Sequence, residues 1–283
     1  MIELTPPFRL HAYERIDSTN DELRRLAASG ERAGAVALAG EQSAGRGRRN
    51  RAWHSPRGNF HGSFLLDPGP EVAKAPELVF VAAVALRETL AGFSSALVQC
   101  KWPNDILVDG KKISGMLLEL TEAYPPPRPS PSRGEGGAAA VTSASPLPPL
   151  RGKDGMGGSR RLVVLGVGVN LIAAPAEALY PAIALCDGGP TITPEQLLQP
   201  FCAALATYID TWRRDGFEPI RTAWLDHAAG LGEPVTARLA DGTTRTGRFA
   251  GLDRDGALLL DGDRILAADV FFAHKELAHA AGH

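Results

Sequence analysis

The sequence has few cysteines and no large excess of either charge, and each shortage excludes a class of protein. The three cysteines, Cys100, Cys186 and Cys202, form no closely spaced pair, so neither a disulfide framework nor a cysteine zinc site is expected. A formal net charge of -2 provides no global basic field that would hold DNA or an acidic membrane.

Long hydrophobic runs are also missing. No stretch of about 18 apolar residues is present, so no membrane-spanning segment is expected. The first seven residues lack the basic stretch and apolar run of a secretion signal. With 44% hydrophobic and 22% charged residues, the 283-residue chain resembles an ordinary globular protein with a sizeable core. We therefore expect a soluble, reduced, cytoplasmic protein.

Helical and strand patterns alternate over residues 1–122. Thr19 and Glu22 have the spacing of a capping box at the start of a helix that Gly30 can end. Pro76 opens an apolar helix that runs to about Gly92. Short buried strands are expected at residues 36–39, 62–66, 98–102 and 106–108.

The composition changes abruptly at residues 123–160, which are rich in Pro, Gly and Ser. Such a segment cannot bury enough apolar surface to offset the entropy of ordering, so it is predicted to be a disordered insertion between two strands. A buried strand follows from Arg161 into the Gly166–Asn170 segment. Thr193, Pro194 and Gln196 then cap a helix that continues to about Trp212.

Asp-Gly pairs mark the expected tight turns. Asp109-Gly110 is a strong hairpin signal, and three further pairs after Gly230 separate short alternating strands. The chain is therefore divided into a domain of residues 1–230, a small β-barrel of residues 231–275 that docks on it, and a tail of residues 276–283.

Three segments are rich in residues that suit ligand chemistry. The first is Gln42-Ser43-Ala44-Gly45-Arg46-Gly47-Arg48-Arg49-Asn50-Arg51-Ala52-Trp53. Its glycines allow close approach to the backbone, arginine forks suit carboxylate and phosphate oxygens, and Trp53 could stack on a flat base. A solvated basic loop or an RNA-binding tract is the alternative interpretation of an arginine run.

The second segment is Lys101-Trp102-Pro103-Asn104-Asp105-Ile106, followed by Lys111-Lys112-Ile113-Ser114-Gly115. Its lysines and Asp105 surround one short hairpin and could meet a polyanion and its metal, although Asn104-Asp105 alone is more typical of a turn. The third is Gly166-Val167-Gly168-Val169-Asn170, which could form a flat wall for a ring or only a strand bulge.

Together with Ser18-Thr19-Asn20, these segments resemble biotin–protein ligases in sequence, order and spacing, over nearly the whole chain except the insertion. The resemblance implies an α+β fold, with a mixed β-sheet catalytic domain covered by helices and a small C-terminal Src-homology-3-like β-barrel. It implies an ATP-dependent ligase that forms biotinyl-5'-AMP and transfers biotin to a lysine of a carboxylase carrier domain. Biotin, ATP and Mg²⁺ would be its small-molecule requirements, with no fixed protein ligands for the metal.

The resemblance also assigns residues to the two ligands. The biotin set covers the polar edge, the closing loop, the carboxylate end and the ring: Ser18, Thr19, Asn20, Gln42, Gly45, Arg46, Gly47, Arg48, Lys112, Gly115, Gly166 and Gly168. The ATP set is Arg46, Arg48, Arg51, Trp53 (on the adenine), Asn104 and Asn170. Arg48 and Lys112 are the predicted catalytic residues, and Asp105 is the candidate base for the acceptor lysine.

Two departures from the family pattern stand out. Asn50 replaces a usual glycine, which we expect to be tolerated because Asn accepts a left-handed backbone. No helix-turn-helix precedes Ser18, so the chain resembles the stand-alone ligase without a DNA-binding domain. The partner expected is a biotin carboxyl carrier domain, with no DNA and no membrane, and the oligomeric state, monomer or homodimer, stays open.

Two other functions compete. A lipoate or octanoate ligase shares the architecture, but its Arg-Arg-x-Ser-Gly-Gly-Gly type of loop is absent. A non-catalytic nucleic-acid-binding module would depend on the arginine run alone.

Overall fold

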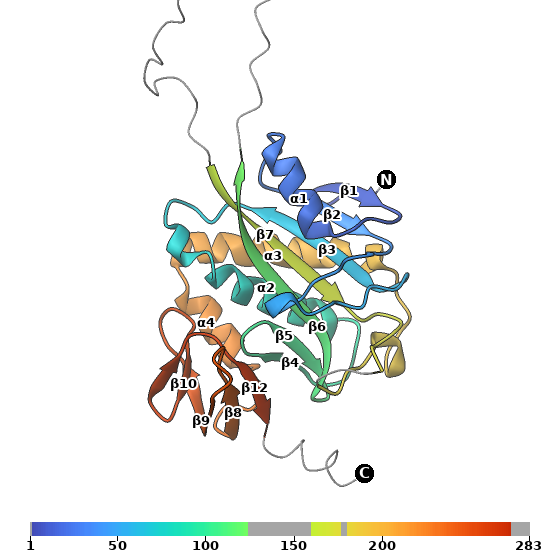
Figure 1. The fold of residues 1–283 in the computed structure, drawn as a ribbon. Helices are drawn as coiled ribbons and strands as arrows, with labels where there is room; N and C mark the ends of the chain where they lie inside the picture. The colour runs from blue at the N-terminus through green and yellow to red at the C-terminus, as the bar shows by residue number, and fades with distance from the viewer. Residues whose placement is uncertain (1, 124–159, 177–179, 273–283) are drawn as a thin grey trace, which may run out of the picture.

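The computed structural model describes residues 2–123, 160–176 and 180–272 (Figure 1). Its larger sheet has seven strands in the order β1-β2-β3-β7-β6-β5-β4. The β1–β2 pair is parallel and the other pairs are antiparallel, which confirms the predicted mixed sheet. The strands are β1 (Arg9–Tyr13), β2 (Ala35–Ala39), β3 (Phe60–Leu66), β4 (Val98–Lys101), β5 (Asp105–Val108), β6 (Lys111–Ala123) and β7 (Arg160–Val169).

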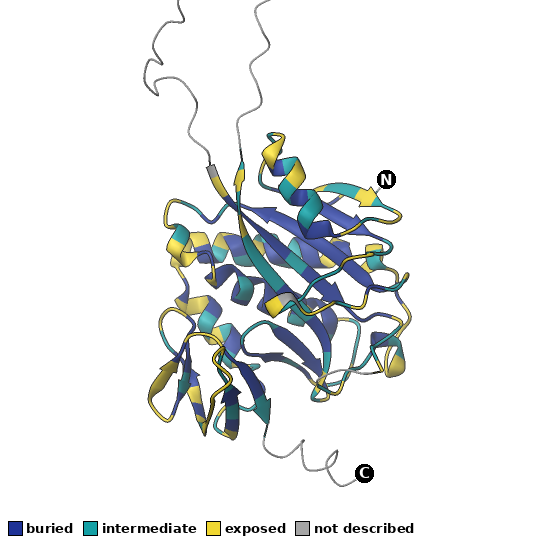
Figure 2. Cartoon of the chain, viewed as in Figure 1, coloured by how far each residue is buried: buried dark blue, intermediate teal, exposed yellow. Residues whose placement is uncertain are grey.

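Helices cover both faces of this sheet (Figure 1). On one face, α1 (Thr19–Ala28) packs Leu23 against Ala35 and Ala37 of β2. On the other face, α2 (Glu77–Ala91) and α3 (Pro194–Asp215) form the main core with the alternate β2 residues. Because side chains alternate across a strand, β2 is buried throughout, as the dark centre of Figure 2 shows.

Of the two predicted helix caps, the one at α3 is confirmed and the one at α1 is wrong. Thr193 and Gln196 form the predicted reciprocal capping box of α3. The predicted cap of α1 at Thr19 is wrong, because Ser18 is the N-cap and accepts a hydrogen bond from the Asp21 backbone N–H at 3.5 Å. The Thr19 side chain is engaged elsewhere, in the site described below.

Short helices and one unpredicted helix complete the large domain. The 3₁₀ helices are η1 (Arg48–Asn50), η2 (Val72–Lys74) and η3 (Leu185–Asp187). The helix α4 (Glu218–Leu225) and the edge strand β1 were not predicted. In the part of the chain that the structure describes, no helix combines the length and the hydrophobicity needed to cross a membrane.

The long β6–β7 hairpin bounds the predicted insertion. Its ladder continues to the Ala123–Arg160 pair, so these two residues belong to the sheet. Residues 124–159, for which disorder was predicted, lie outside the described residues, as does the predicted tail of residues 276–283.

The C-terminal strands form a five-stranded antiparallel sheet in the order β11-β10-β9-β8-β12, in agreement with the predicted small β domain. It docks on the large domain, as expected: the Trp102 indole N–H donates to the Gly256 carbonyl at 3.0 Å, and Trp224 packs edge-on against Phe249. One hydrophobic core therefore runs through both domains. The strands are β8 (Pro234–Arg238), β9 (Thr244–Leu252), β10 (Leu258–Leu260), β11 (Asp263–Ile265) and β12 (Asp269–Phe272).

Candidate functional site

On the face of the large sheet that α1 covers, the positions at one end of the central strands are occupied by glycines. Along β7, Leu162 and Val164 pack under α1, and the next two positions on that face are Gly166 and Gly168. Gly168 pairs with Gly115 of β6, which removes a further side chain from the same row. We call this surface the glycine floor (Gly115, Gly166 and Gly168).

Two side chains already use the space above the glycine floor. A Cβ atom on Gly168 would lie 2.3 Å from Cε2 of the Trp53 indole, and one on Gly166 would lie 2.3 Å from Oδ1 of Asn20. Both distances are shorter than real Cβ contacts, so a side chain at either position would force Asn20 or Trp53 to move. Trp53, predicted to contact the adenine, thus lies against a glycine predicted to flank the ring of biotin.

The segment of residues 42–53, here called the arginine loop, covers the floor as a short hairpin. The Trp53 N–H donates to the Gly45 carbonyl at 2.9 Å, and the Gly47 N–H donates to the Arg51 carbonyl at 2.7 Å. A Cβ on Gly45 would lie 2.6 Å from Ser55 Oγ, so the space at this glycine is taken by the chain itself. The space was predicted to serve an approaching ligand.

The left-handed residue of the loop is Arg49, with φ of 57°. Asn50 does not have a positive φ, so the argument that its side chain suits a left-handed backbone does not apply there. A residue that carries a Cβ atom is sterically disfavoured in this left-handed region. Arg49 nevertheless adopts it, and its side chain is bonded outside the loop.

Between the arginine loop and the glycine floor lies a cavity of about 1060 Å³. All residues predicted for the biotin set, the ATP set and catalysis line this one cavity, although they come from segments far apart in the sequence. The site prediction missed other lining residues, and those with polar or charged side chains include His54, Ser55, Lys101, Tyr180 and Asp269.

One end of the cavity is a network of neutral side chains. Gln42 Oε1 accepts from the Thr19 backbone N–H at 2.9 Å and from the Thr19 hydroxyl at 3.0 Å, and its Nε2 donates to Ser55 at 3.0 Å. Ser63 of β3 donates to Asn20 Oδ1 at 2.6 Å and lies 2.7 Å from the Thr19 hydroxyl. We call these residues the neutral end. Its side chains are held in fixed orientations by one another and, through Asn20, by the Glu119 carboxylate, to which Asn20 Nδ2 donates at 2.7 Å.

The opposite end carries charge. The Lys112 ammonium lies 2.7 Å from a carboxylate oxygen of Asp105, and Arg48 donates to Asn104 Oδ1 at 3.2 Å. Asn104 is held in turn by its bond to the Met116 carbonyl at 2.5 Å. Burial lowers the pKa of the Arg48 guanidinium from its usual value, because desolvation disfavours its charge. We call this group the charged end.

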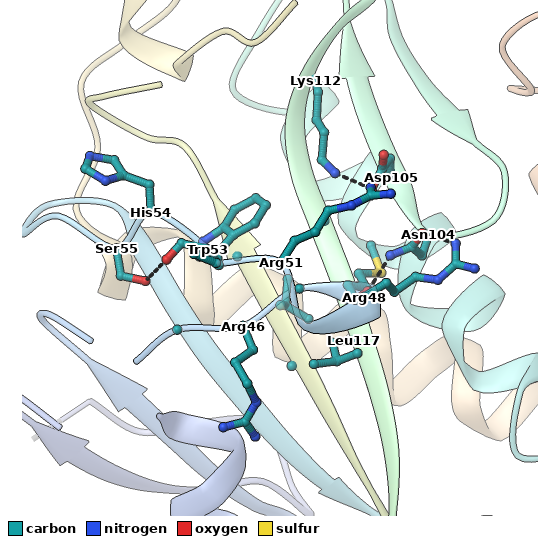
Figure 3. A pocket seen from close by; sticks show the side chains of 18 of the residues that line it. Arg46, Arg48, Arg51, Trp53, His54, Ser55, Asn104, Asp105, Lys112 and Leu117 are labelled. Carbon is teal, nitrogen blue, oxygen red and sulfur yellow. Dashed lines mark hydrogen bonds and ion pairs between the residues drawn. The ribbon is translucent and has the colours of Figure 1, made fainter. Parts of the chain in front are cut away.

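Arg46 does not join the charged end. Its guanidinium makes two bonds to Asp21 of α1, at 2.5 and 2.7 Å, and Figure 3 shows it directed away from Arg48, Arg51 and Lys112. These bonds hold the pKa of the Asp21 carboxyl below its usual value. Arg46 lines the cavity, but in this arrangement it does not face a carboxylate or phosphate ligand in the way that was predicted.

The other arginines of the loop reach the small domain. Arg49 donates to Asp269 at the start of β12 at 3.0 Å, and Arg51 bonds to the same carboxylate oxygen. The four arginines of the loop are thus bonded to groups of the same chain rather than presented as an open basic surface. This arrangement argues against the RNA-binding interpretation of the arginine run.

Lys101 also lines the cavity, and its ammonium lies 3.6 Å from the centre of the Tyr180 ring. Asn170, predicted to bind ATP, donates to the Ile183 carbonyl at 3.3 Å and so also ties the following loop to the sheet. No group of three or more potential metal ligands among His, Cys, Asp and Glu occurs within the described residues.

Comparison with known proteins agrees with this architecture. The model of the biotin/lipoate A/B protein ligase family matches residues 12–124, and that of the biotin protein ligase C-terminal domain matches residues 230–272. A biotin–[acetyl-CoA-carboxylase] ligase of Paracoccus denitrificans is 38% identical over 273 residues, which cover 91% of this chain and 98% of that protein. This chain belongs to the biotin protein ligase family, whose members are ATP-dependent enzymes of biotin attachment.

Two further relatives define the extent of the match. The bifunctional ligase/repressor BirA of Escherichia coli is 30% identical over 258 residues, which cover 89% of this chain but 68% of that protein. The solved biotin protein ligase from Aquifex aeolicus, in complex with biotin and ATP, has a TM-score of 0.71 at 23% identity and covers 94% of this chain and 99% of its own. That likeness establishes the fold.

Proposed function

We propose that this chain joins biotin to ATP to form biotinyl-5'-AMP and pyrophosphate, and then transfers biotin to a lysine of the carrier domain of acetyl-CoA carboxylase. The observation that carries the proposal is one cavity that is lined in one part by neutral hydrogen-bonding groups and in another part by cations. Biotin has the matching chemistry, with an uncharged bicyclic ring at one end and a carboxylate at the other.

In the first step, a biotin carboxylate oxygen attacks the α-phosphorus of ATP, and the bond to pyrophosphate breaks. Two anions must approach each other, so groups that offset negative charge where it develops lower the barrier. We assign this role to Arg48 and Lys112, with Arg51 on the nucleotide phosphates and Asn104 near the α-phosphate. The neutral end, with Thr19 and Gln42, would hold the ring of biotin.

The remaining members of the two sets keep supporting roles in the proposal. The glycine floor would let Asn20 and Trp53 lie close to the sheet beside the ring, and Trp53 would separate the ring from the adenine. Asn170 is proposed for the nucleotide side. For Arg46 we propose that the guanidinium holds the arginine loop to α1 through Asp21, so that its backbone and not its charge faces the ligand.

Magnesium would enter with ATP. Asp105 and Asp269 are the carboxylates among the described cavity residues, and both are engaged by cations, so the donor set fits a metal held mainly by the nucleotide. When bound, Mg²⁺ would offset the charge of the leaving pyrophosphate.

In the second step, the carrier lysine amine attacks the carbonyl carbon, an amide bond forms and AMP leaves. The amine must lose a proton, because a lysine with a pKa near 10.4 is almost entirely protonated at neutral pH. Asp105 is proposed to accept this proton, with Lys112 adjacent to stabilise the carboxylate.

Biotin-dependent exchange of pyrophosphate into ATP, measured with magnesium and without carrier protein, tests the first step. Incorporation of labelled biotin into a purified biotin carboxyl carrier domain tests the second step. Lipoate and octanoate in place of biotin provide the comparison with the lipoate ligase alternative. We expect exchange with biotin only, and equal exchange with lipoate would contradict the proposal.

A further inference from the structure

Asp269 is the point where the small domain enters the cavity. It is the first residue of β12, its side chain is 8% exposed, and it lines the cavity together with Val270. Its carboxylate forms ion pairs with Arg49 and Arg51 of the arginine loop, and the Arg238 guanidinium of β8 lies 4.0 Å from it. A residue of the C-terminal domain therefore contacts the loop that covers the cavity.

This contact is charged at neutral pH. Burial alone would raise the pKa of the Asp269 carboxyl, but the hydrogen bond from Arg51 and the charges of Arg51, Arg49 and Arg48 outweigh burial and hold the pKa below its usual value. Several guanidinium groups share this one carboxylate, so the cluster keeps a positive excess that suits a polyphosphate.

The contact also restricts Arg51. An arginine side chain loses up to about 2 kcal/mol of rotamer entropy when it is fixed. Because Arg51 is already bonded to the Asp269 carboxylate, part of this entropy is lost before the ligand binds. Through its bonds to Arg49 and Arg51, the carboxylate joins the 3₁₀ turn Arg48–Asn50, which contains the left-handed Arg49, to the small domain.

We propose that Asp269 is a positioning residue, through which the C-terminal domain holds Arg51 and the arginine loop at the nucleotide end of the cavity. The small domain is then part of the ATP site rather than an appended module. This inference deepens the proposed function, on which its nucleotide side rests.

The kinetic test compares Asp269→Asn, which keeps the volume and removes the charge, with Asp263→Asn in β11. Asp263 bonds to Arg245 at 3.0 Å on the surface of the same domain and is the matched control. We expect Asp269→Asn to raise KM for ATP at least about ten-fold, the scale of one lost charged hydrogen bond, and to change KM for biotin much less. Asp269→Glu should recover part of the loss. Unchanged KM for ATP, or equal increases in both KM values, would overturn the proposal.

A second measurement does not depend on activity. Hydrogen–deuterium exchange of the unliganded protein should be faster over residues 45–53 in Asp269→Asn than in wild type, and unchanged there in Asp263→Asn. Equal protection of the loop in wild type and Asp269→Asn would overturn the anchoring role. Absence of biotin-dependent exchange in the wild-type enzyme would instead reject the proposed function, so the two failures are distinguishable.

Discussion

The two ends of the cavity are built on different principles. At the neutral end, Thr19, Gln42 and Ser63 satisfy one another, and none carries a charge. At the charged end, Lys112 and Arg51 are held by carboxylates, although the described cavity residues include more cations than carboxylates. A fixed neutral network selects by shape and hydrogen-bond direction, whereas an excess of cations selects by charge and stabilises anions that form during a reaction.

Because the two ends differ in this way, substitutions at one end should affect selectivity for biotin and substitutions at the other should affect the rate of reaction. A change at the neutral end should weaken the binding of biotin with little effect on ATP. A change at the charged end should slow adenylate formation more than it weakens biotin. The following variants test this division, from the largest expected effect to the smallest.

Lys112→Ala should slow single-turnover formation of biotinyl-AMP by about 100-fold or more, the scale of losing one preorganised electrostatic group. The variant also leaves the buried Asp105 carboxylate without its ammonium partner. Lys111→Ala is the matched control, because Lys111 begins the same strand and is exposed. A wild-type rate for Lys112→Ala would remove this residue from the chemistry.

Gly168→Ala should force Trp53 off the glycine floor, because the new Cβ would lie 2.3 Å from the indole. We expect the free energy of unfolding to fall by about 1–3 kcal/mol, as for other overpacked sites, and the affinity for biotin to fall with it. Gly188→Ala serves as control, since no atom lies within 4 Å of its Cβ position. Urea unfolding and biotin titration measure both effects, and a tolerated Gly168→Ala would show that the Trp53 contact is dispensable.

Thr19→Val keeps the shape of the side chain but removes the hydroxyl that bonds to Gln42. The lost bond in a buried network is worth about 1–3 kcal/mol, so KM for biotin should rise about ten-fold or more while KM for ATP stays near its wild-type value. Thr207→Val, on the exposed side of α3, is the control. If KM for ATP rose equally, the two ends of the cavity would not be separable.

His61 allows a smaller test at the neutral side of the floor, where it pairs with Gly168. Burial, and then the charge of His54, lower the pKa of the His61 imidazole, against the opposing bond to the Pro56 carbonyl. The folded state therefore binds the proton less readily than the unfolded chain, whose histidine pKa is near 6.5. Stability should be full above about pH 6.5 and decrease as the pH falls below it. Urea unfolding at pH 7.5 and 5.5 should show a smaller decrease for His61→Asn than for wild type, and an equal decrease would contradict this assignment.

The sequence predicted the features whose signals are local. The capping box of Thr193 and Gln196 is readable from four consecutive residues, and the Asp109-Gly110 turn has the positive φ values of 48° and 72° that its residue types favour. The glycines of β7 were singled out because glycine in a strand needs a reason, and the structure supplies Asn20 and Trp53 as neighbours.

What the sequence could not predict depends on partners distant along the chain. Thr19 has the spacing of a cap, but Gln42 and Ser63 bind its hydroxyl and Ser18 takes its place. Arg46 and Arg48 look alike in the sequence, yet Asp21 attracts only the first. Nothing near Asp269 marks it as a site residue, because its importance comes from arginines about 220 residues earlier, which the domain packing brings to it.

The β6–β7 hairpin has a practical consequence. Ala123 and Arg160 are cross-strand neighbours, so the sheet sets no length for the sequence that joins them. At about 3.3 Å per residue, they are about 26 Å along the strands from Gly115 and Gly168. A fluorescent reporter or affinity tag placed between Ala123 and Arg160 would therefore join the sheet at this distance from the glycine floor, and biotin-dependent pyrophosphate exchange by the tagged enzyme measures whether catalysis tolerates it.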